Sequence, residues 1–323
     1  MTTFSQIIGH ERQKDVLQRV LASGRLAHAY LFTGPDGIGK QLMAFALARA
    51  VVCDEQRGCG DCPACRKLDH RNHPDFHRLE PDGSSIKIEQ VRALQRELHL
   101  KPLESPRKIC LIDQAELMTP AAANALLKTL EEPRGDSLIV LLSSQPNRLL
   151  ETIRSRCQLL PFSHHPRSRI KQELERQLGI ESAQAHVLAA LSAGSFKKAF
   201  GSDRELYLEQ RPALLKTLTG LSTGSILPIL DFAEQLAADK AALPDILEIF
   251  QAFYRDTLLQ LHGRDSEEFV NLDLLEKIRR VANRETIGSL LDKLAALTEA
   301  RRHLDRNVNR QLAMEVLLLH LAA

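Results

Sequence analysis

The chain has 323 residues, of which 44% are hydrophobic and 26% charged, and its net charge is +2 at pH 7. This length suits two or three domains of ~100–200 residues each, and the near-neutral charge excludes nucleic-acid binding through an overall basic excess. Residues 1–6 lack the features of a secretory signal and no apolar run reaches the ~18 residues of a membrane span, so we expect a cytoplasmic protein without a membrane partner.

Apolar strands and helices alternate in the first half of the chain, which predicts a parallel sheet covered by helices on both faces. The apolar runs that predict buried strands are residues 29–33, 108–112, 138–142 and 158–162. The segments with helical spacing of apolar residues are 10–23, 39–52, 90–99 and 119–133. A loop rich in cysteine and glycine fills the interval from 53 to about 65.

The second half of the chain reads as helical. Short helices are expected over 167–200, and the pattern stays helical from about residue 205 to the end. A composition change near 163–166 and a Gly-Ser-Asp turn near 201–205 divide the chain. We therefore expect domains at 1–163, 164–204 and 205–323.

Residues 34–40, Gly-Pro-Asp-Gly-Ile-Gly-Lys, match a phosphate-binding loop between a strand and a helix. Gly34, Gly37 and Gly39 let backbone N–H groups approach phosphates, and Lys40 would reach them with its ammonium group. A glycine turn followed by a solvated lysine is the plain alternative. The position after Lys40, where a hydroxyl normally ligates Mg²⁺, holds Gln41.

Asp113 ends the strand 108–112, where a second carboxylate that organises Mg²⁺ belongs; a helix-capping acid is the plain alternative. The next residue is Gln114, which cannot act as a base as a glutamate could. Two losses in one site predict weak nucleotide binding to this loop without hydrolysis.

Four cysteines, Cys53, Cys59, Cys62 and Cys65, lie within thirteen residues, with glycines and a proline between them. Their C-x5-C-x2-C-x2-C spacing predicts a closed structural zinc site. Free thiols or an iron–sulfur cluster are the alternatives. Cys110 and Cys157 read as small buried apolar residues.

Several motifs together resemble the clamp-loader subunits of the AAA+ superfamily, and the delta-prime family of DNA polymerase III most closely. These are residues 7–10, the phosphate loop, the cysteine segment, TPAAANALLKTLEEP at 119–133, LLETIRSRC at 149–157, residues 194–197 and residues 307–309. The resemblance implies an α/β P-loop (AAA+) domain with a zinc module, followed by a helical lid and an all-α collar that forms the oligomer.

The same resemblance assigns roles to individual residues. Arg156 is implied as an arginine finger that acts in trans on a neighbouring ATPase subunit, although a solvated basic helix end or a local ion pair is the plain alternative. Lys197 stands where catalytic members have an arginine near the nucleotide, and Ile7 and Ile8 would line the adenine pocket. Ser143 and Ser144, which follow the third predicted strand, stand at the sensor-1 position of the family.

The implied partners are the gamma/tau ATPase and delta subunits of a loader and, through them, the sliding clamp and primed DNA. A catalytic ATPase subunit and an independent AAA+ motor both require intact catalysis, which Gln41 and Gln114 argue against. A zinc-dependent nucleic-acid-binding module would need a basic cysteine segment, whereas this one holds three acidic residues and one arginine.

Overall fold

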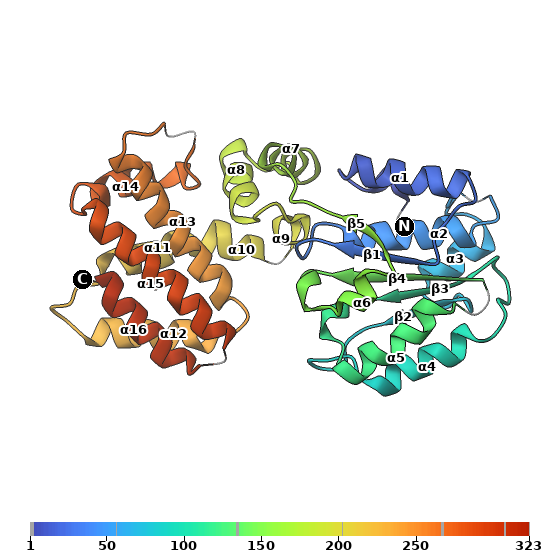
Figure 1. The fold of residues 1–323 in the computed structure, drawn as a ribbon. Coiled ribbons are helices and arrows are strands. Elements are labelled where there is room, and N and C mark those ends of the chain that lie inside the picture. Colours follow the sequence, from blue (N-terminus) through green and yellow to red (C-terminus); the bar gives the residue numbers. More distant parts are fainter. Residues whose placement is uncertain are drawn as a thin grey trace. The chain divides into compact units, whose positions relative to one another are not determined.

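The computed structural model describes residues 3–55, 57–133, 136–201, 203–265, 268–306 and 308–322, and Asn307 of the motif at 307–309 lies outside them. The chain divides into two compact units, residues 1–165 and 166–323 (Figure 1). Among the described residues, no helix combines the length and the apolar character that a membrane span requires.

The first unit is built on a five-stranded parallel sheet in the order β2-β3-β4-β1-β5. The strands are β1 (Ala29–Thr33), β2 (Phe76–Leu79), β3 (Lys108–Ile112), β4 (Ser137–Ser143) and β5 (Gln158–Pro161). Every residue of β1, β3 and β4 is buried, as expected for central strands covered on both faces. The four predicted strands are confirmed.

The strand β2 was not among the predicted ones. It reads Phe-His-Arg-Leu and pairs only with β3 at the edge of the sheet, so most of its side chains are half-buried. An edge strand buries less of its surface than a central one and therefore lacks the continuous apolar run that identifies the others.

Helices cover both faces of this sheet (Figure 1). Successive residues of a strand point to opposite faces, so β1, β3 and β4 each contribute side chains to both apolar cores. Tyr30 and Phe32 of β1 pack on one side with α1, α2 and α3, whereas Leu31 packs on the other side with α4, α5 and α6. The bounds are α1 (Glu11–Ala22), α2 (Lys40–Val52), α3 (Pro63–Asp69), α4 (Ile88–Leu98), α5 (Pro120–Glu131) and α6 (Glu151–Arg154).

The regular elements described in the second unit are all helices, and one apolar core includes residues from Ile170 to Leu321. Asp256, fully buried, accepts hydrogen bonds from the backbone and side chain of Asn271, which in turn accepts one from buried Arg211. The helices are α7 (Arg167–Leu178), α8 (Ser182–Leu191), α9 (Phe196–Phe200), α10 (Asp203–Glu205), α11 (Arg211–Gly220), α12 (Leu227–Ala238), α13 (Leu243–Leu261), α14 (Leu275–Ala282), α15 (Ile287–Asp305) and α16 (Arg310–Ala322).

Candidate functional site

The phosphate-loop motif connects β1 to the start of α2. Gly34, Gly37 and Gly39 all have positive φ, and Gly34 donates its N–H to the carbonyl of Ser143 on β4 at 3.1 Å. A Cβ on Gly34 would lie 2.3 Å from the carbonyl oxygen of Phe162. The loop therefore needs glycine at position 34 for its own packing, whatever it binds.

Lys40 is buried at the first position of α2, and its ammonium group folds back on the loop. Nζ donates to the carbonyl of Gly34 and, at 2.6 Å, to that of Pro35, and it lies 3.8 Å from Asp36. Burial lowers the pKa of Lys40, and the nearby carboxylates of Asp36, Glu116 and Asp113 oppose this effect. A bound phosphate would have to replace the two carbonyl contacts.

Asp113 lies at the carboxyl end of β3, and donors occupy both of its oxygens. Oδ2 accepts from Gln41 Nε2 at 2.9 Å and from Arg78 Nη2 at 3.2 Å, while Oδ1 accepts from the backbone N–H of Gln114 at 3.0 Å. The side chains of Gln41 and Arg78 thus converge on the carboxylate where Mg²⁺ would be organised.

Glu116 is hydrogen-bonded to Ser144, the residue that follows β4. Its Oε1 accepts from the backbone N–H of Ser144 at 2.9 Å and from the Ser144 hydroxyl at 2.6 Å. Burial would raise the pKa of Glu116, but these hydrogen bonds lower it. Ser143, which is buried, accepts a hydrogen bond from the backbone N–H of Gln145 through its hydroxyl oxygen.

Two histidines bracket the phosphate loop at the carbonyl of Ile38. The Nε2 atoms of His10 and His165 lie 2.7 and 3.0 Å from that oxygen, and the two rings are 4.3 Å apart. Burial lowers the pKa of His10 to about 4, so the ring is neutral near pH 7 and donates Nε2–H. Ile7 is buried in the apolar core on the α1–α3 side of the sheet, and Ile8 is half-buried.

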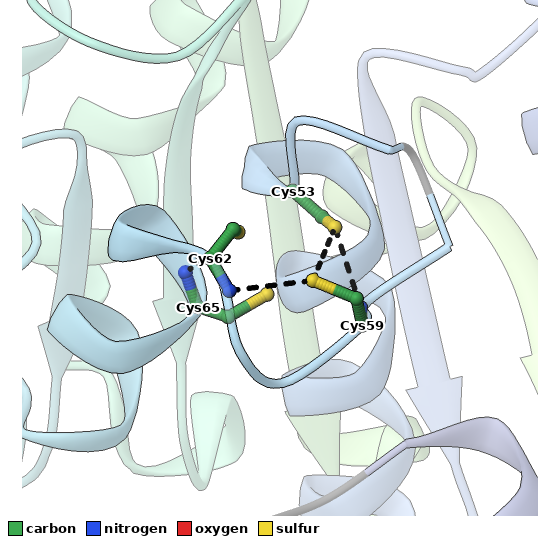
Figure 2. Close-up of side chains that lie close together, drawn as sticks. All are labelled: Cys53, Cys59, Cys62 and Cys65. Carbon is green, nitrogen blue, oxygen red and sulfur yellow. Dashed lines mark hydrogen bonds between the residues drawn. The ribbon is translucent and has the colours of Figure 1, made fainter.

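The four cysteines converge where α2 ends and α3 begins (Figure 2). Their sulfur atoms all lie within 4.8 Å of one another, and those of Cys53 and Cys59 are 3.6 Å apart. Four thiolates around Zn²⁺ at 2.3 Å would be about 3.8 Å apart, so the donor set fits a tetrahedral ion. Backbone N–H groups of Cys59, Cys62 and Cys65 point at the sulfurs of Cys53, Cys59 and Cys62 respectively.

Arg49, one turn before the end of α2, supports this cluster. Its side chain is only 3% exposed and forms an ion pair with Asp69 at the end of α3. Gly58 would place a Cβ 3.1 Å from Arg49 Cγ, and Gly60 would place one 3.5 Å from Nη1. The ion pair with Asp69 thus joins the helices α2 and α3, which carry the cluster at their ends.

Arg156 follows α6 and is partly exposed. Its Nη2 lies 2.8 Å from Glu131 Oε1 at the end of α5, and Nη1 donates to the carbonyl of Thr152 at 3.0 Å. The guanidinium is thereby held at the surface of its own unit. Lys197 is exposed on α9 of the other unit, where the neighbouring Lys198 pairs with Asp245 and Glu248.

The structure therefore brings together Gly34, Gly37, Gly39, Lys40 and Asp113 around one loop, and the four cysteines around one point. Sequence reasoning missed Arg78, the paired histidines and Arg49. For Arg78 the local sequence offers one signal, an arginine between the apolar residues of a short edge strand. For the paired histidines and Arg49 the local sequence offers none.

Comparisons with known proteins agree over nearly the whole chain. Residues 9–166 match the family model "DNA polymerase III, delta subunit" and residues 205–323 match "DNA polymerase III, delta subunit, C terminal". The chain is 35% identical to DNA polymerase III subunit delta' of Bacillus subtilis (strain 168), covering 96% of this chain and 95% of the relative. It is 30% identical to the Escherichia coli (strain K12) subunit delta', with 93% and 90% covered.

Among solved structures, a DNA polymerase III gamma subunit-related protein from Thermotoga maritima is similar. It has a TM-score of 0.48 and 20% sequence identity, covering 95% of this chain and 98% of that one.

Proposed function

Because the chain belongs to the family of DNA polymerase III delta-prime subunits, we propose that it is a non-hydrolysing subunit of the sliding-clamp loader. The observation that carries this proposal is a contrast within the first unit. Gln41 and Gln114 stand where a metal ligand and a base are needed, yet Arg156 is held at the surface, where a neighbouring subunit can reach it.

Arg156 then serves as an arginine finger in trans. A guanidinium is always charged and can bridge two phosphate oxygens, which suits transition-state stabilisation in phosphoryl transfer. Its side chain is 35% exposed and that of Glu131 is 47% exposed. Ion pairs this exposed are worth about 0–1 kcal/mol, so a neighbour's nucleotide competes easily for the guanidinium.

The proposed partners are the gamma/tau ATPase and delta subunits and, through the assembled loader, the ring clamp and primed DNA in the cytoplasm. We assign residues 1–163 to the AAA+ P-loop domain, 164–204 to the lid and 205–323 to the collar. In support of an assembling collar, α12 and α16 pack together while both leave large apolar side chains exposed. These side chains are Leu227, Leu230, Leu312, Val316 and Leu319.

The four cysteines are proposed to hold one structural zinc ion. All four ligand positions are filled by protein sulfur, so no position stays open for a reacting water. Lys40 and the three loop glycines are proposed to hold nucleotide without hydrolysis, with Ile7 and Ile8 against the base.

The test is a loader reconstituted with Arg156→Ala, with Arg154→Ala as the control because Arg154 is an exposed neighbour. Arginine fingers in other phosphoryl-transfer systems raise the rate by about 10³–10⁵. ATP hydrolysis at the site served by Arg156 should therefore become undetectable. We expect loss of a substantial part of the DNA- and clamp-stimulated ATPase and poor clamp loading at matched assembly. Arg156→Lys should restore little. Unchanged rates with Arg156→Ala would overturn the proposal.

A further inference from the structure

The position beside the phosphate loop where related folds bind Mg²⁺ has an unusual set of side chains in this protein. Phosphate loops normally act with Mg²⁺, held by a loop hydroxyl and organised by a strand-end carboxylate. Here the hydroxyl position holds Gln41, and the carboxylate of Asp113 is engaged by Gln41 and Arg78. The residues present do not fit a magnesium ion.

The orientation of Gln41 follows from chemistry. An ionised carboxylate only accepts hydrogen bonds, so the amide must turn its NH₂ group toward Asp113 and its oxygen away. The same carboxylate oxygen receives Arg78, and the second receives the backbone of Gln114. A metal ion would have to displace donors from either oxygen and would meet a fixed positive charge beside it.

Arg78 is built into this position. Its side chain is only 17% exposed, it also pairs with Glu80, and its guanidinium carbon lies 5.7 Å from the ring centroid of Phe45 on α2. The sheet places it there as well, because β2 and β3 run parallel and the backbone N–H of Asp113 donates to the carbonyl of Leu79 at 2.9 Å.

We infer that Arg78, with Gln41, takes the place of the divalent cation, and that the loop binds a nucleoside triphosphate in its metal-free form. The positive charge that Mg²⁺ would supply comes from the protein. This inference rests on the proposal that Lys40 and the loop glycines still hold nucleotide, and it names the ionic form of that ligand.

The experiment titrates the purified full-length chain with an N-methylanthraniloyl derivative of ATP, in excess Mg²⁺ and in EDTA. The wild-type Kd should agree within about 2-fold between the two conditions, and Lys40→Ala should abolish binding in both. The double variant Gln41→Thr with Arg78→Met should bind at least about 10-fold more tightly with Mg²⁺ than in EDTA. Arg96→Met removes an exposed arginine from α4 and should behave as wild type.

Wild-type affinity that falls more than about 10-fold in EDTA would overturn the inference, because the cation would then be required. Lack of binding in both conditions up to millimolar probe would overturn it too. Neither result touches the trans role of Arg156, which the loader assay reads separately. Conversely, a loader assay that shows no role for Arg156 would not change the magnesium dependence of nucleotide binding to this loop.

Discussion

The two ends of α2 adjoin two candidate binding sites that differ in whether protein side chains occupy the groups that would bind a metal ion. At its first residue, Lys40, the helix begins at the phosphate-loop motif, beside the Asp113 carboxylate that accepts hydrogen bonds from Gln41 and Arg78. Just after its last residue, Cys53 joins three other cysteines that converge on one point. Side chains from α2 and β2 occupy the carboxylate oxygens at the first end, whereas the four sulfur atoms at the second end lie together.

The packing of the phosphate loop explains why position 34 holds glycine, whatever the loop binds. Gly34 donates to β4 and lies too close to the Phe162 carbonyl to accept a side chain. These contacts belong to the packing of the sheet, so they select for glycine independently of catalysis. An intact phosphate-loop motif is therefore evidence for the fold before it is evidence for hydrolysis.

The largest effect is expected from removing a ligand at the cysteine end. The wild-type chain should contain about one zinc per molecule, and Cys62→Ser should lose it, because structural zinc sites contribute about 10–16 kcal/mol to folding of small modules. Elemental analysis measures the metal, and hydrogen exchange should show α3 unprotected while β1, β3 and β4 stay protected. Cys157→Ser is the control. Wild-type protein purified without chelators and free of metal would contradict the assignment.

A smaller effect should follow from Arg49→Met, which keeps the length of the side chain and leaves Asp69 without its partner. Breaking a largely buried ion pair costs about 3–5 kcal/mol, and Arg49 is 3% exposed whereas Asp69 is 23% exposed. Urea unfolding of the zinc-loaded protein measures the change. Arg57→Met removes an arginine that is 73% exposed, and it should cost less than about 1 kcal/mol. Equal losses in the two variants would mean that Arg49 does not support the cluster.

At the other end, His10 should make stability depend on pH. Its pKa is about 4 in the folded chain, below the ordinary 6.5, so the unfolded chain binds more protons between these values. Stability is thus complete above pH 6.5 and falls as the pH drops toward 4, by about 1–2 kcal/mol after allowance for solvent screening. Urea unfolding at pH 7 and pH 5 should show a weaker pH dependence for His10→Gln than for wild type. His70→Gln, an exposed control, should not change it, and an unaltered slope in His10→Gln would refute the role.

The smallest expected effect is none. The isolated chain should show no ATPase turnover, and Lys40→Ala should leave this background unchanged, since neither a metal ligand at 41 nor a base at 114 is present to act with the lysine. A phosphate-release assay at high protein concentration measures it. Turnover that disappears with Lys40→Ala would contradict this prediction, because the phosphate loop would then be an active hydrolytic site.

Much of the first unit follows from local sequence, because buried strands need continuous apolar runs and the phosphate loop and cysteine motifs are contiguous. The edge strand β2 lacks such a run and was missed. The side chains that decide the state of each site were missed for another reason. Arg78 reaches Asp113 across 35 positions of the chain and His165 reaches Ile38 across 127, and contacts this distant depend on how the chain is folded.

The helix α2 itself has a thermodynamic consequence. It is buried along nearly its whole length of 13 residues, about 20 Å, so it acts as a stiff rod between the cysteine cluster and the phosphate loop. If zinc binding changes nucleotide affinity by some factor, nucleotide must change zinc affinity by the same factor. Measuring zinc release with and without nucleotide would therefore report the coupling free energy between the two ends from either direction.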